Sequence, residues 1–276
     1  MEPLVSVIIP AYNHASFVKE CLDSVLNEGY PNIEIVIIDD GSQDGTAEQI
    51  ERWIKDHDHE IPIKFISQEN SGVSKVLNRC IALARGEYIL PLASDDGLIS
   101  GGIASRVNFL NAHHEYGAVF GDCMVVDNVG SKIFSSGIFE MHGVRKGGYL
   151  QSSHQLAKEI IWRWAVPGPV VIYRKSYLCS LGGFNNKRKV EDWDIYLRMV
   201  ADGRVAYLDE VVSYYRLHSF NASKNNESRV RRIHFELLKT AFANLSYFSG
   251  ELRFLLIKKT LVILYILLMS YFGKKI

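Results

Sequence analysis

Three pairs of neighbouring carboxylates are the residues of this sequence whose types and spacing fit metal or acid–base chemistry. They are Asp39-Asp40, Asp95-Asp96 and Glu191-Asp192. Paired carboxylates hold a divalent cation against an anionic ligand, and a single carboxylate takes a proton from an attacking hydroxyl. The same residue types also favour ordinary turns and the first turns of helices. The elements around each pair therefore have to decide between the two interpretations.

The first hundred residues alternate short apolar runs with helical patterns. Short runs rich in β-branched residues are typical of strands covered on both faces, and TAEQ at 46–49 matches a capping box that begins a helix. This alternation predicts a parallel sheet with helices on both faces. Strands are expected at 5–9, 33–38, 63–66 and 88–92, and helices at 17–26, 46–54 and 73–84.

Polar segments follow three strands of the predicted sheet. Residues 10–13 (PAYN), 39–42 (DDGS) and 94–96 (SDD) each come directly after an apolar run. Ligands of parallel α/β sheets bind beyond the carboxyl ends of the strands, so we expect these segments to converge at one edge. After Gly101 the pattern is less regular, with strands expected at 117–126 and 170–173, loops and short strands at 130–148, and a helix from near Glu191.

Six segments form a pattern that none of them carries alone. They are VSVIIPAYN (5–13), EIVIIDDGSQDGT (34–46), NSGVSKVLN (70–78), ARGEYILPLASDD (84–96), GGF (182–184) and EDWDIYLR (191–198). In this order they resemble the family-2 inverting glycosyltransferases with the GT-A fold, over most of the chain from about Val5 to His218. The resemblance implies a Rossmann-like α/β fold with a mixed, mainly parallel sheet flanked by helices. It also implies transfer of a sugar from a nucleoside diphosphate donor to an acceptor hydroxyl.

The resemblance implies a divalent metal, Mn²⁺ or Mg²⁺, which offsets the charge of the leaving diphosphate. In the family pattern the last acid of the SDD segment is the direct ligand, so Asp96 is expected to bind the metal and Asp95 to face the ribose or the diphosphate. Many relatives have a further acid where this chain has Ala93. His218, in the segment YRLH, is a third ligand, a diphosphate contact or a structural residue. The expected metal ligands are thus Asp95, Asp96 and His218.

The resemblance also assigns the donor site. Asp39 matches a position that accepts the imide N–H of uracil, which favours a UDP-sugar and leaves dTDP and GDP open, and Asp40 fits the same role or a turn. Tyr12 can stack on the flat base. Lys75 supplies a positive charge near the donor or belongs to a solvated helix face. The expected donor-binding residues are Pro10, Ala11, Tyr12, Asn13, Asp39, Asp40, Asn70, Gly72, Lys75, Ser94, Asp95 and Arg216, the last as a phosphate partner.

Glu191-Asp192 resembles the acidic pair of the family. In an inverting transfer the acceptor hydroxyl loses its proton as it attacks, and a carboxylate can take that proton. Asp192 is expected to be this base, with Glu191 supporting it or contacting the acceptor. Both acids also suit the first turn of a helix, where the dipole favours negative charge. Trp162 and Trp164 lie where relatives build the acceptor side and could stack on a sugar, but burial in the core is the simpler interpretation and is preferred.

The last residues are apolar and interrupted by lysines. Residues 254–257 and 261–272 are apolar, and Lys258-Lys259 separates them. The longer run falls short of the ~20 residues of a membrane span and suits a helix that lies in the membrane interface. A core helix, an oligomer contact and a tilted span are the alternatives. We expect a glycosyltransferase domain over 1–220 and C-terminal helices over 221–276, the last of them (about 251–273) on a membrane that carries a lipid-linked glycan acceptor.

Charge and cysteine content narrow the setting. The 31 basic residues balance the 31 acidic ones, so no nucleic-acid partner is expected. Four cysteines without a paired motif favour a reducing compartment, and the strand pattern at the N-terminus leads us to expect no signal peptide. The expected location is the cytoplasm, peripherally on the inner face of the cell membrane.

Two other functions fit part of the pattern. A nucleotidyltransferase would share the α/β core and the metal acids, but it needs a glycine- and arginine-rich loop after the first strand. This chain has PAYNHAS there. A catalytically inactive nucleotide-sugar-binding or scaffolding protein at the membrane would need neither Asp96 nor Asp192, and both are present. We therefore expect a glycosyltransferase.

Overall fold

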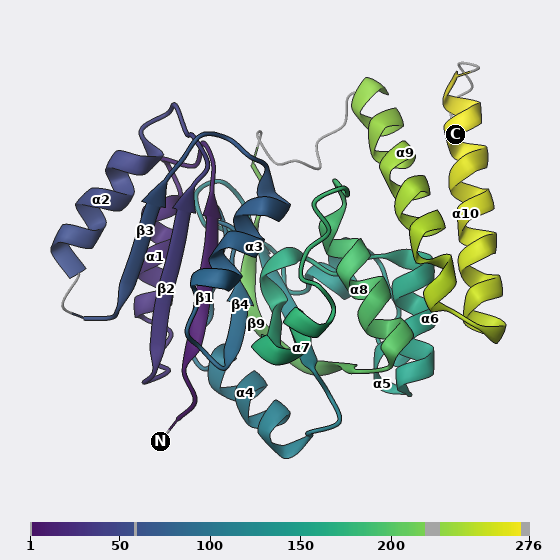
Figure 1. Ribbon diagram of the computed structural model, residues 1–276, viewed down its shortest axis with the longest axis horizontal. Helices are drawn as coiled ribbons and strands as arrows, with labels where there is room; N and C mark the ends of the chain where they lie inside the picture. Colours follow the sequence, from purple (N-terminus) through teal and green to yellow (C-terminus); the bar gives the residue numbers. More distant parts are fainter. Residues whose placement is uncertain (1, 58–59, 219–226, 272–276) are drawn as a thin grey trace.

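The computed structural model describes residues 2–57, 60–218 and 227–271. They form one mixed sheet flanked by helices (Figure 1). The strands lie side by side in the order β3-β2-β1-β4-β8-β6-β9-β5, and β7 pairs with β6. Their bounds are β1 Val5–Ala11, β2 Ile33–Asp39, β3 Ile63–Ser67, β4 Tyr88–Pro91, β5 Gly97–Leu98, β6 Ala118–Val126, β7 Lys132–Phe134, β8 Val171–Arg174 and β9 Val205–Arg216.

The first half of the sheet is parallel, as the alternation of strands and helices predicts. β1 pairs in parallel with β2 and β4, and β2 with β3. The second half is mixed, because β8 runs antiparallel to β4 and β6 while β9 runs parallel to β6. The carboxyl ends of β1, β2 and β4 therefore meet at one edge, and the three polar segments that follow them lie there.

The central strands β1, β2 and β4 are mostly apolar because both faces of the sheet are covered there. Ile8 and Val36 belong to one hydrophobic core, whereas Val7, Ile9 and Ile35 belong to the other. This alternation follows from the two-residue period of a strand. Residues of α1 Val18–Leu26, α2 Thr46–His57 and α4 Gly102–Ala112 complete the second core, and residues of α3 Val73–Leu83, α6 Ser153–Arg163 and α8 Glu191–Asp202 complete the first.

Helices α9 Glu227–Asn244 and α10 Gly250–Tyr271 lie side by side at the end of the molecule remote from β3 (Figure 1). α10 also packs on α6. Two further helices are short, α5 Gly147–Leu150 and α7 Lys175–Ser180. Within the described ranges, no helix has both the length and the apolar character that crossing a bilayer requires. Residues 272 and 273, expected to end the last helix, lie outside the described residues.

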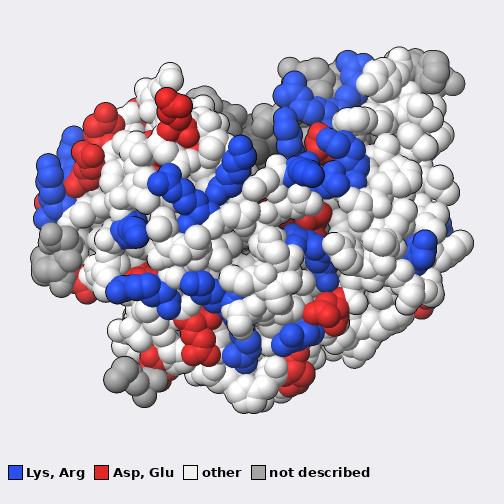
Figure 2. Space-filling model, viewed as in Figure 1, with Lys and Arg blue, Asp and Glu red and all other residues white. Residues whose placement is uncertain are grey.

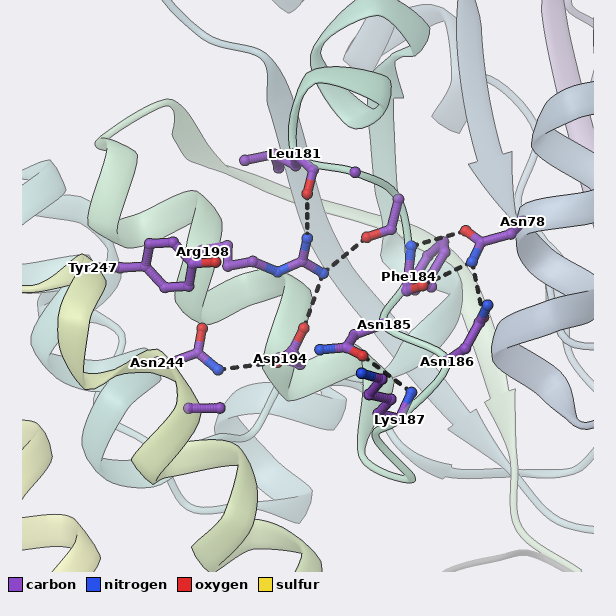
Figure 3. A pocket seen from close by; sticks show the side chains of 13 residues that line it. Asn78, Leu181, Phe184, Asn185, Asn186, Lys187, Asp194, Arg198, Asn244 and Tyr247 are labelled. Atoms are coloured by element: carbon purple, nitrogen blue, oxygen red, sulfur yellow. Dashed lines mark hydrogen bonds and ion pairs between the residues drawn. The ribbon is translucent and has the colours of Figure 1, made fainter.

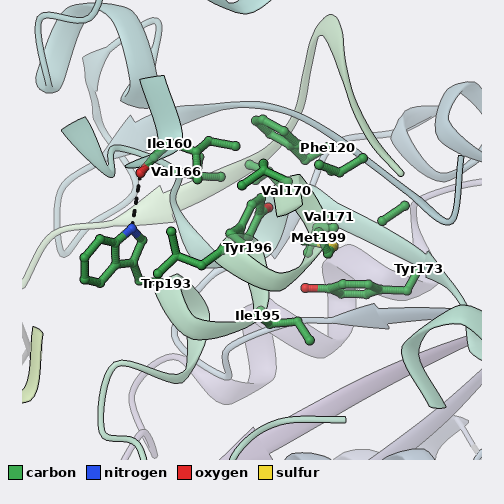
Figure 4. Close-up of a cluster of buried hydrophobic side chains, with 14 of the residues drawn as sticks. Phe120, Ile160, Val166, Val170, Val171, Tyr173, Trp193, Ile195, Tyr196 and Met199 are labelled. Carbon is green, nitrogen blue, oxygen red and sulfur yellow. Dashed lines mark hydrogen bonds between the residues drawn. The ribbon is translucent and has the colours of Figure 1, made fainter. Parts of the chain in front are cut away.

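Helix α8 is fixed in the larger core from its first turn onward. Trp193 is completely buried, and its indole N–H donates to the carbonyl of Ile160 at 3.2 Å. One turn further along, Tyr196 meets the ring of Phe120 edge-on with centroids 5.4 Å apart. Figure 4 shows these rings among the branched aliphatic side chains of β8 and α6. This packing holds the start of α8, and with it Glu191 and Asp192, in place.

Candidate active site

A cleft of about 1430 Å³ opens at the edge where β1, β2 and β4 end. The loop that follows β1, the start of α3 and the SDD segment line one part of it. The loop 164–168 and the first turn of α8 line another. The sequence-predicted residues that meet in this cleft are Pro10, Ala11, Tyr12, Asn13, Asp40, Asn70, Gly72, Asp95, Asp96, Glu191 and Asp192.

Three side chains in or beside the cleft have the types and spacing of metal ligands. Asp95 Oδ2 lies 2.9 Å from Nε2 of His218, and Asp95 Oδ1 lies 3.6 Å from Nδ1 of His14. One ligand atom from each residue lies within 4.8 Å of the others. Burial lowers the pKa of His14 more than the Asp95 carboxylate raises it. His14 is thereby kept in the neutral form, which binds metals.

The cluster centres on Asp95, whereas the sequence analysis favours Asp96 as the direct ligand. Asp96 is almost completely buried, and its Oδ1 accepts the backbone N–H of Arg216 at 2.9 Å. Burial, and then the charge of Asp95, raise the pKa of Asp96. Among the described residues the metal-type group comprises His14, Asp95 and His218, without Asp96.

His14 is the member of this group that the sequence analysis misses. It follows directly after PAYN, so its position beyond the end of β1 was open to the same argument as its neighbours. Its ring is held by Ser94, whose hydroxyl lies 2.8 Å from Nδ1. The buried Ser94 therefore positions a candidate ligand and does not line the cleft itself.

Arg216 lies beneath the SDD segment and not in the cleft. Its guanidinium donates to the carbonyls of Asp95 at 3.0 Å and Asp127 at 3.2 Å, and it pairs with Glu20 at 2.7 Å. The side chain is 1% exposed. We therefore correct the expected phosphate contact: Arg216 holds the Asp95 loop from below. Lys75 is exposed on α3 and is not among the residues that line the cleft.

The geometry separates the two candidate acids at the end of β2. Asp40 accepts hydrogen bonds from the N–H groups of Ser71 and Gly72 at 2.9 and 2.8 Å, and from the amide of Gln68. Burial acts to raise its pKa, but these hydrogen bonds outweigh burial and lower it. Asp39 uses one oxygen to accept from Ser42, and no described residue hydrogen-bonds its buried Oδ1. Asp40 thus fixes the loop before α3 and lines the cleft, while Asp39 is buried with one oxygen unpartnered among the described residues and does not itself line the cleft.

The loop after β1 is tied to the loop after β2. Asn13 has a left-handed backbone (φ 54°), and its side-chain oxygen accepts from the N–H of Gln43 at 2.9 Å. Its own N–H donates to Ser42 at 2.9 Å. The neighbouring Tyr12 is 48% exposed and lines the cleft. An aromatic face is therefore presented at the cleft by a loop that is itself held in place.

Glu191 and Asp192 form the first turn of α8 and face the cleft. Burial and the adjacent charge of Asp192 raise the pKa of Glu191 to about 8. Burial also raises the pKa of Asp192, although its Oδ1 accepts the N–H of Trp193 at 2.7 Å. Raised carboxylate pKa values in a cleft are typical of acid–base residues. Asp194, two residues on, instead pairs with Arg198 at 2.9 Å.

The two tryptophans before this helix have different surroundings. Trp164 lines the cleft and contacts the ring of Tyr196, with centroids 5.0 Å apart. Trp162 lies against α10, where Lys258 and Lys259 stand over its ring at 5.5 and 5.6 Å. Only Trp164 is therefore available to a ligand in the cleft.

A comparison with known protein families identifies the family of this chain. The family model described as glycosyl transferase family 2 matches residues 6–159, more than half of the chain. The chain belongs to glycosyl transferase family 2. The matched residues include β1 to β4, the SDD segment and β6, and so contain the whole parallel half of the sheet.

Relatives and solved structures agree with this family. The chain is 25% identical to a chondroitin synthase of Escherichia coli over 88% of its own length and 33% of that protein. It is similar in fold to a mannosyltransferase of Pyrobaculum calidifontis in complex with GDP-Man and Mn²⁺ (20% identity, TM-score 0.72, 98% of this chain and 74% of that one). It is also similar to residues 1–349 of TarS from S. aureus with UDP-GlcNAc (20% identity, TM-score 0.68, 98% and 73%).

The similar structures support the fold, and the curated relatives match this chain over only part of their own length. At 20% identity the two structures show the GT-A fold expected from the motifs. The chain spans only 35%, 33% and 22% of the length of three curated relatives that it matches. The family and the fold are thus shown.

Proposed function

We propose that this protein is a metal-dependent inverting glycosyltransferase that moves a sugar from a nucleoside diphosphate, with UDP favoured, to an acceptor hydroxyl. The observation that carries the proposal is that His14 and Asp95 line the same cleft as the Glu191-Asp192 pair, with the buried His218 completing the metal-type cluster behind them. The cluster suits a diphosphate leaving group, and the acidic pair suits a hydroxyl that must lose a proton. The family supports the same chemistry.

The donor types of the cluster fit Mn²⁺ better than Mg²⁺. Two imidazole nitrogens and one carboxylate are offered, and Mg²⁺ prefers oxygen ligands and retains its waters. When bound there, the metal would neutralise the charge of the departing diphosphate. The complex of the fold neighbour from Pyrobaculum with Mn²⁺ supports this choice. His14 and His218 would hold the ion, with Asp95 between them.

In the proposed donor pocket, Tyr12 and Asp39 recognise the nucleobase. The exposed ring of Tyr12 stacks on the base, and the free oxygen of Asp39 accepts the imide N–H, which uracil has and cytosine lacks. Asp40 acts through the backbone of Ser71 and Gly72, which it fixes. The UDP-GlcNAc complex of TarS supports a UDP-sugar, and the GDP-Man complex keeps GDP in the test.

A thermal-melting panel tests the proposed donor site. UDP, GDP, dTDP and CDP are compared with and without Mn²⁺, because a ligand that binds only the folded state raises Tm. We expect UDP with Mn²⁺ to give the largest increase, Asp95→Asn to abolish its metal dependence and His14→Ala to weaken it. Lys55→Ala, at an exposed position of α2 outside the cleft, is the control and should behave like the unchanged protein. Absence of any shift would favour the inactive scaffold.

The raised pKa values predict an unusual pH dependence of transfer. Only the carboxylate form of Asp192 accepts a proton, and burial raises its pKa. Transfer should therefore be lost as pH falls, with a midpoint above the usual carboxylate value of about 4. Glu191, with a pKa of about 8, is itself protonated and uncharged near that midpoint, so Glu191→Gln should leave the midpoint where it is. Measuring kcat/KM against pH for both forms checks this, and a midpoint near 4 in the unchanged enzyme would contradict it.

We propose that the chain divides near residue 220 and that its C-terminal helices contact a membrane. Leu256, Ile263 and Leu267 of α10 are buried against the protein. The opposite face of α10 exposes Phe254, Ile257, Leu261, Tyr265 and Leu268. Figure 2 shows a mostly uncharged outer edge over α10 and a group of Lys and Arg side chains over α9. Apolar and aromatic side chains next to basic ones suit an interface with anionic lipid.

The setting of the acceptor follows from that contact. A lipid-linked glycan would present its hydroxyl to a protein lying on the membrane surface. All four cysteines are free thiols, which supports a reducing compartment and the inner face of the cell membrane.

Co-sedimentation with vesicles tests the membrane contact. We expect binding to vesicles of phosphatidylglycerol and phosphatidylcholine, and we expect salt to weaken it. In the double variant Leu261→Asp/Tyr265→Asp, binding should be weaker by about tenfold or more, because charged groups replace apolar area that the membrane would bury. Val129→Asp alters an equally exposed apolar residue elsewhere and serves as the control. Equal binding by the double variant and the control would refute the assignment of this face.

A further inference from the structure

A second pocket lies further along α8 than the cleft. Its volume is about 400 Å³. Figure 3 shows that its walls come from the loop 181–187, from Asp194 and Arg198 of α8, and from Asn244 and Tyr247 at the end of α9. None of these residues lines the donor cleft. The pocket is therefore a separate concavity at the junction of the catalytic sheet and the C-terminal helices.

The loop of this pocket is held rigidly from two sides. Asn78 of α3 donates to the carbonyl of Phe184 at 2.7 Å and accepts the N–H of Phe184 at 2.9 Å. Arg198 donates to the carbonyls of Leu181 and Gly183 at 2.6 and 2.9 Å. A Cβ at Gly183 would come within 2.5 Å of Asn78 Oδ1, so the close approach requires glycine. Asn185, Asn186 and Lys187 are thus presented from a preformed base, which lowers the entropic cost of binding.

The chemistry of the walls fits a hydroxyl-bearing ligand. Four asparagines, Asn78, Asn185, Asn186 and Asn244, line the pocket, and an amide offers donors and an acceptor side by side, as sugar hydroxyls require. Asn244 donates to Asp194 at 2.9 Å, while no described residue hydrogen-bonds its own buried oxygen.

The charges of the walls argue against a strongly anionic ligand. Arg198 is paired with Asp194 at 2.9 Å, so the exposed Lys187 provides the only excess charge among the lining residues. A phosphate group favours clusters of arginine with free donors. Here there is a single arginine, whose two terminal nitrogens are committed to the loop carbonyls and to Asp194 and whose remaining Nε is buried. A neutral sugar, or a sugar with one carboxylate, matches this balance.

Tyr247 supplies the surface that sugar rings use. It is 59% exposed and stands at the wall of the pocket. The C–H face of a pyranose packs on an aromatic ring while its hydroxyls turn to polar groups. An aromatic wall opposite a row of amides therefore presents both halves of such a contact. The volume of the pocket accommodates one or two pyranose rings and is typical of a small-molecule site.

We propose that this pocket is a second carbohydrate-binding site, which holds a pyranose unit apart from the reaction cleft. Its use for a distal sugar of the acceptor or product rests on the proposed function, whereas sugar binding itself does not. The site adjoins the reaction centre through α8, since Asp194 and Arg198 line the pocket and Glu191 and Asp192 of the same helix line the cleft.

Saturation-transfer NMR on the full chain tests the site. The probes are glucose, galactose, N-acetylglucosamine, N-acetylgalactosamine and glucuronate, each in the presence of saturating UDP and Mn²⁺ to occupy the cleft. We expect transfer to at least one sugar and about fivefold weaker binding in Tyr247→Ala. Asn185→Ala should weaken binding as well. Tyr265→Ala is the matched control, because Tyr265 is 58% exposed and lies on α10 away from the pocket.

The outcomes separate this site from the proposed function. Absence of a saturation-transfer signal for all five sugars would overturn the site, whether or not UDP raises Tm. A saturation-transfer signal that remains in Tyr247→Ala and Asn185→Ala but is lost in Tyr12→Ala would also overturn the site, because the sugar would then occupy the cleft. A third outcome is a saturation-transfer signal that depends on Tyr247 while UDP and Mn²⁺ leave Tm unchanged. This result would uphold the sugar site and refute the proposed donor site.

Discussion

Replacing Asp192 by Asn is expected to lower kcat by about 10²- to 10⁴-fold, the usual contribution of a general base. Asparagine keeps the shape of the side chain and can still accept the N–H of Trp193, which Asp192 accepts at 2.7 Å. The first turn of α8 should therefore retain its structure. What is lost is the basic oxygen that takes the proton of the acceptor hydroxyl. Rates with the donor identified by the melting panel check this prediction.

Two controls limit the interpretation of that loss. Asp202→Asn alters an exposed acid at the other end of the same helix and should leave kcat unchanged. UDP binding by Asp192→Asn, measured by melting with Mn²⁺, should remain close to that of the unchanged protein, because Asp192 is placed on the acceptor side. If Asp192→Asn retains full activity, Asp192 is not the base, and Glu191 becomes the next residue to replace.

The second large effect is expected at Asp95. Asp95→Asn removes the charge between His14 and His218, which lie 3.6 and 2.9 Å from its two oxygens. Metal-dependent UDP binding should be abolished, and transfer should fall by about 10²-fold or more, because the charge of the leaving diphosphate is no longer offset. Titration of Mn²⁺ in the presence of UDP measures the loss of the ion directly. His14→Ala should show a smaller loss in the same titration, since two ligands remain.

Asp96→Asn is the matched comparison. It alters the neighbouring acid, and the amide oxygen can still accept the backbone N–H of Arg216 that Asp96 binds at 2.9 Å. The cluster geometry predicts that this variant binds Mn²⁺ much like the unchanged protein. The opposite pattern, with loss in Asp96→Asn and retention in Asp95→Asn, would restore Asp96 as the direct ligand and refute the His14–Asp95–His218 site.

Local patterns were sufficient for the parallel half of the sheet. Runs such as residues 5–9 and 33–38 are mostly apolar because they become strands that are buried at every one of these positions. The carboxyl ends of parallel strands meet at one edge, so the convergence of the polar segments also followed from the pattern. Glu191-Asp192 was found at the start of a helix for the same local reason.

Long-range contacts decided the roles that the motifs left open. His14 and His218 meet across Asp95 only because β9 returns beside the SDD segment. That return also draws Arg216 beneath the segment, where its donors are used by backbone carbonyls and by Glu20. Asp39 and Asp40 are indistinguishable as neighbours in a sequence. Their difference arises because the start of α3 donates its N–H groups to one of them.

The sequence by itself determined the family pattern, the parallel strands, the edge at which the site forms and the acidic pair on α8. Each is encoded by neighbours in the chain or by the periodicity of a single element. The tertiary structure decided which acid lies between two histidines, which tryptophan lines the cleft, and that a second pocket exists between α8 and α9. These features depend on residues that are far apart in the chain. Their proximity is set by how the elements pack, and packing leaves no local pattern in the sequence.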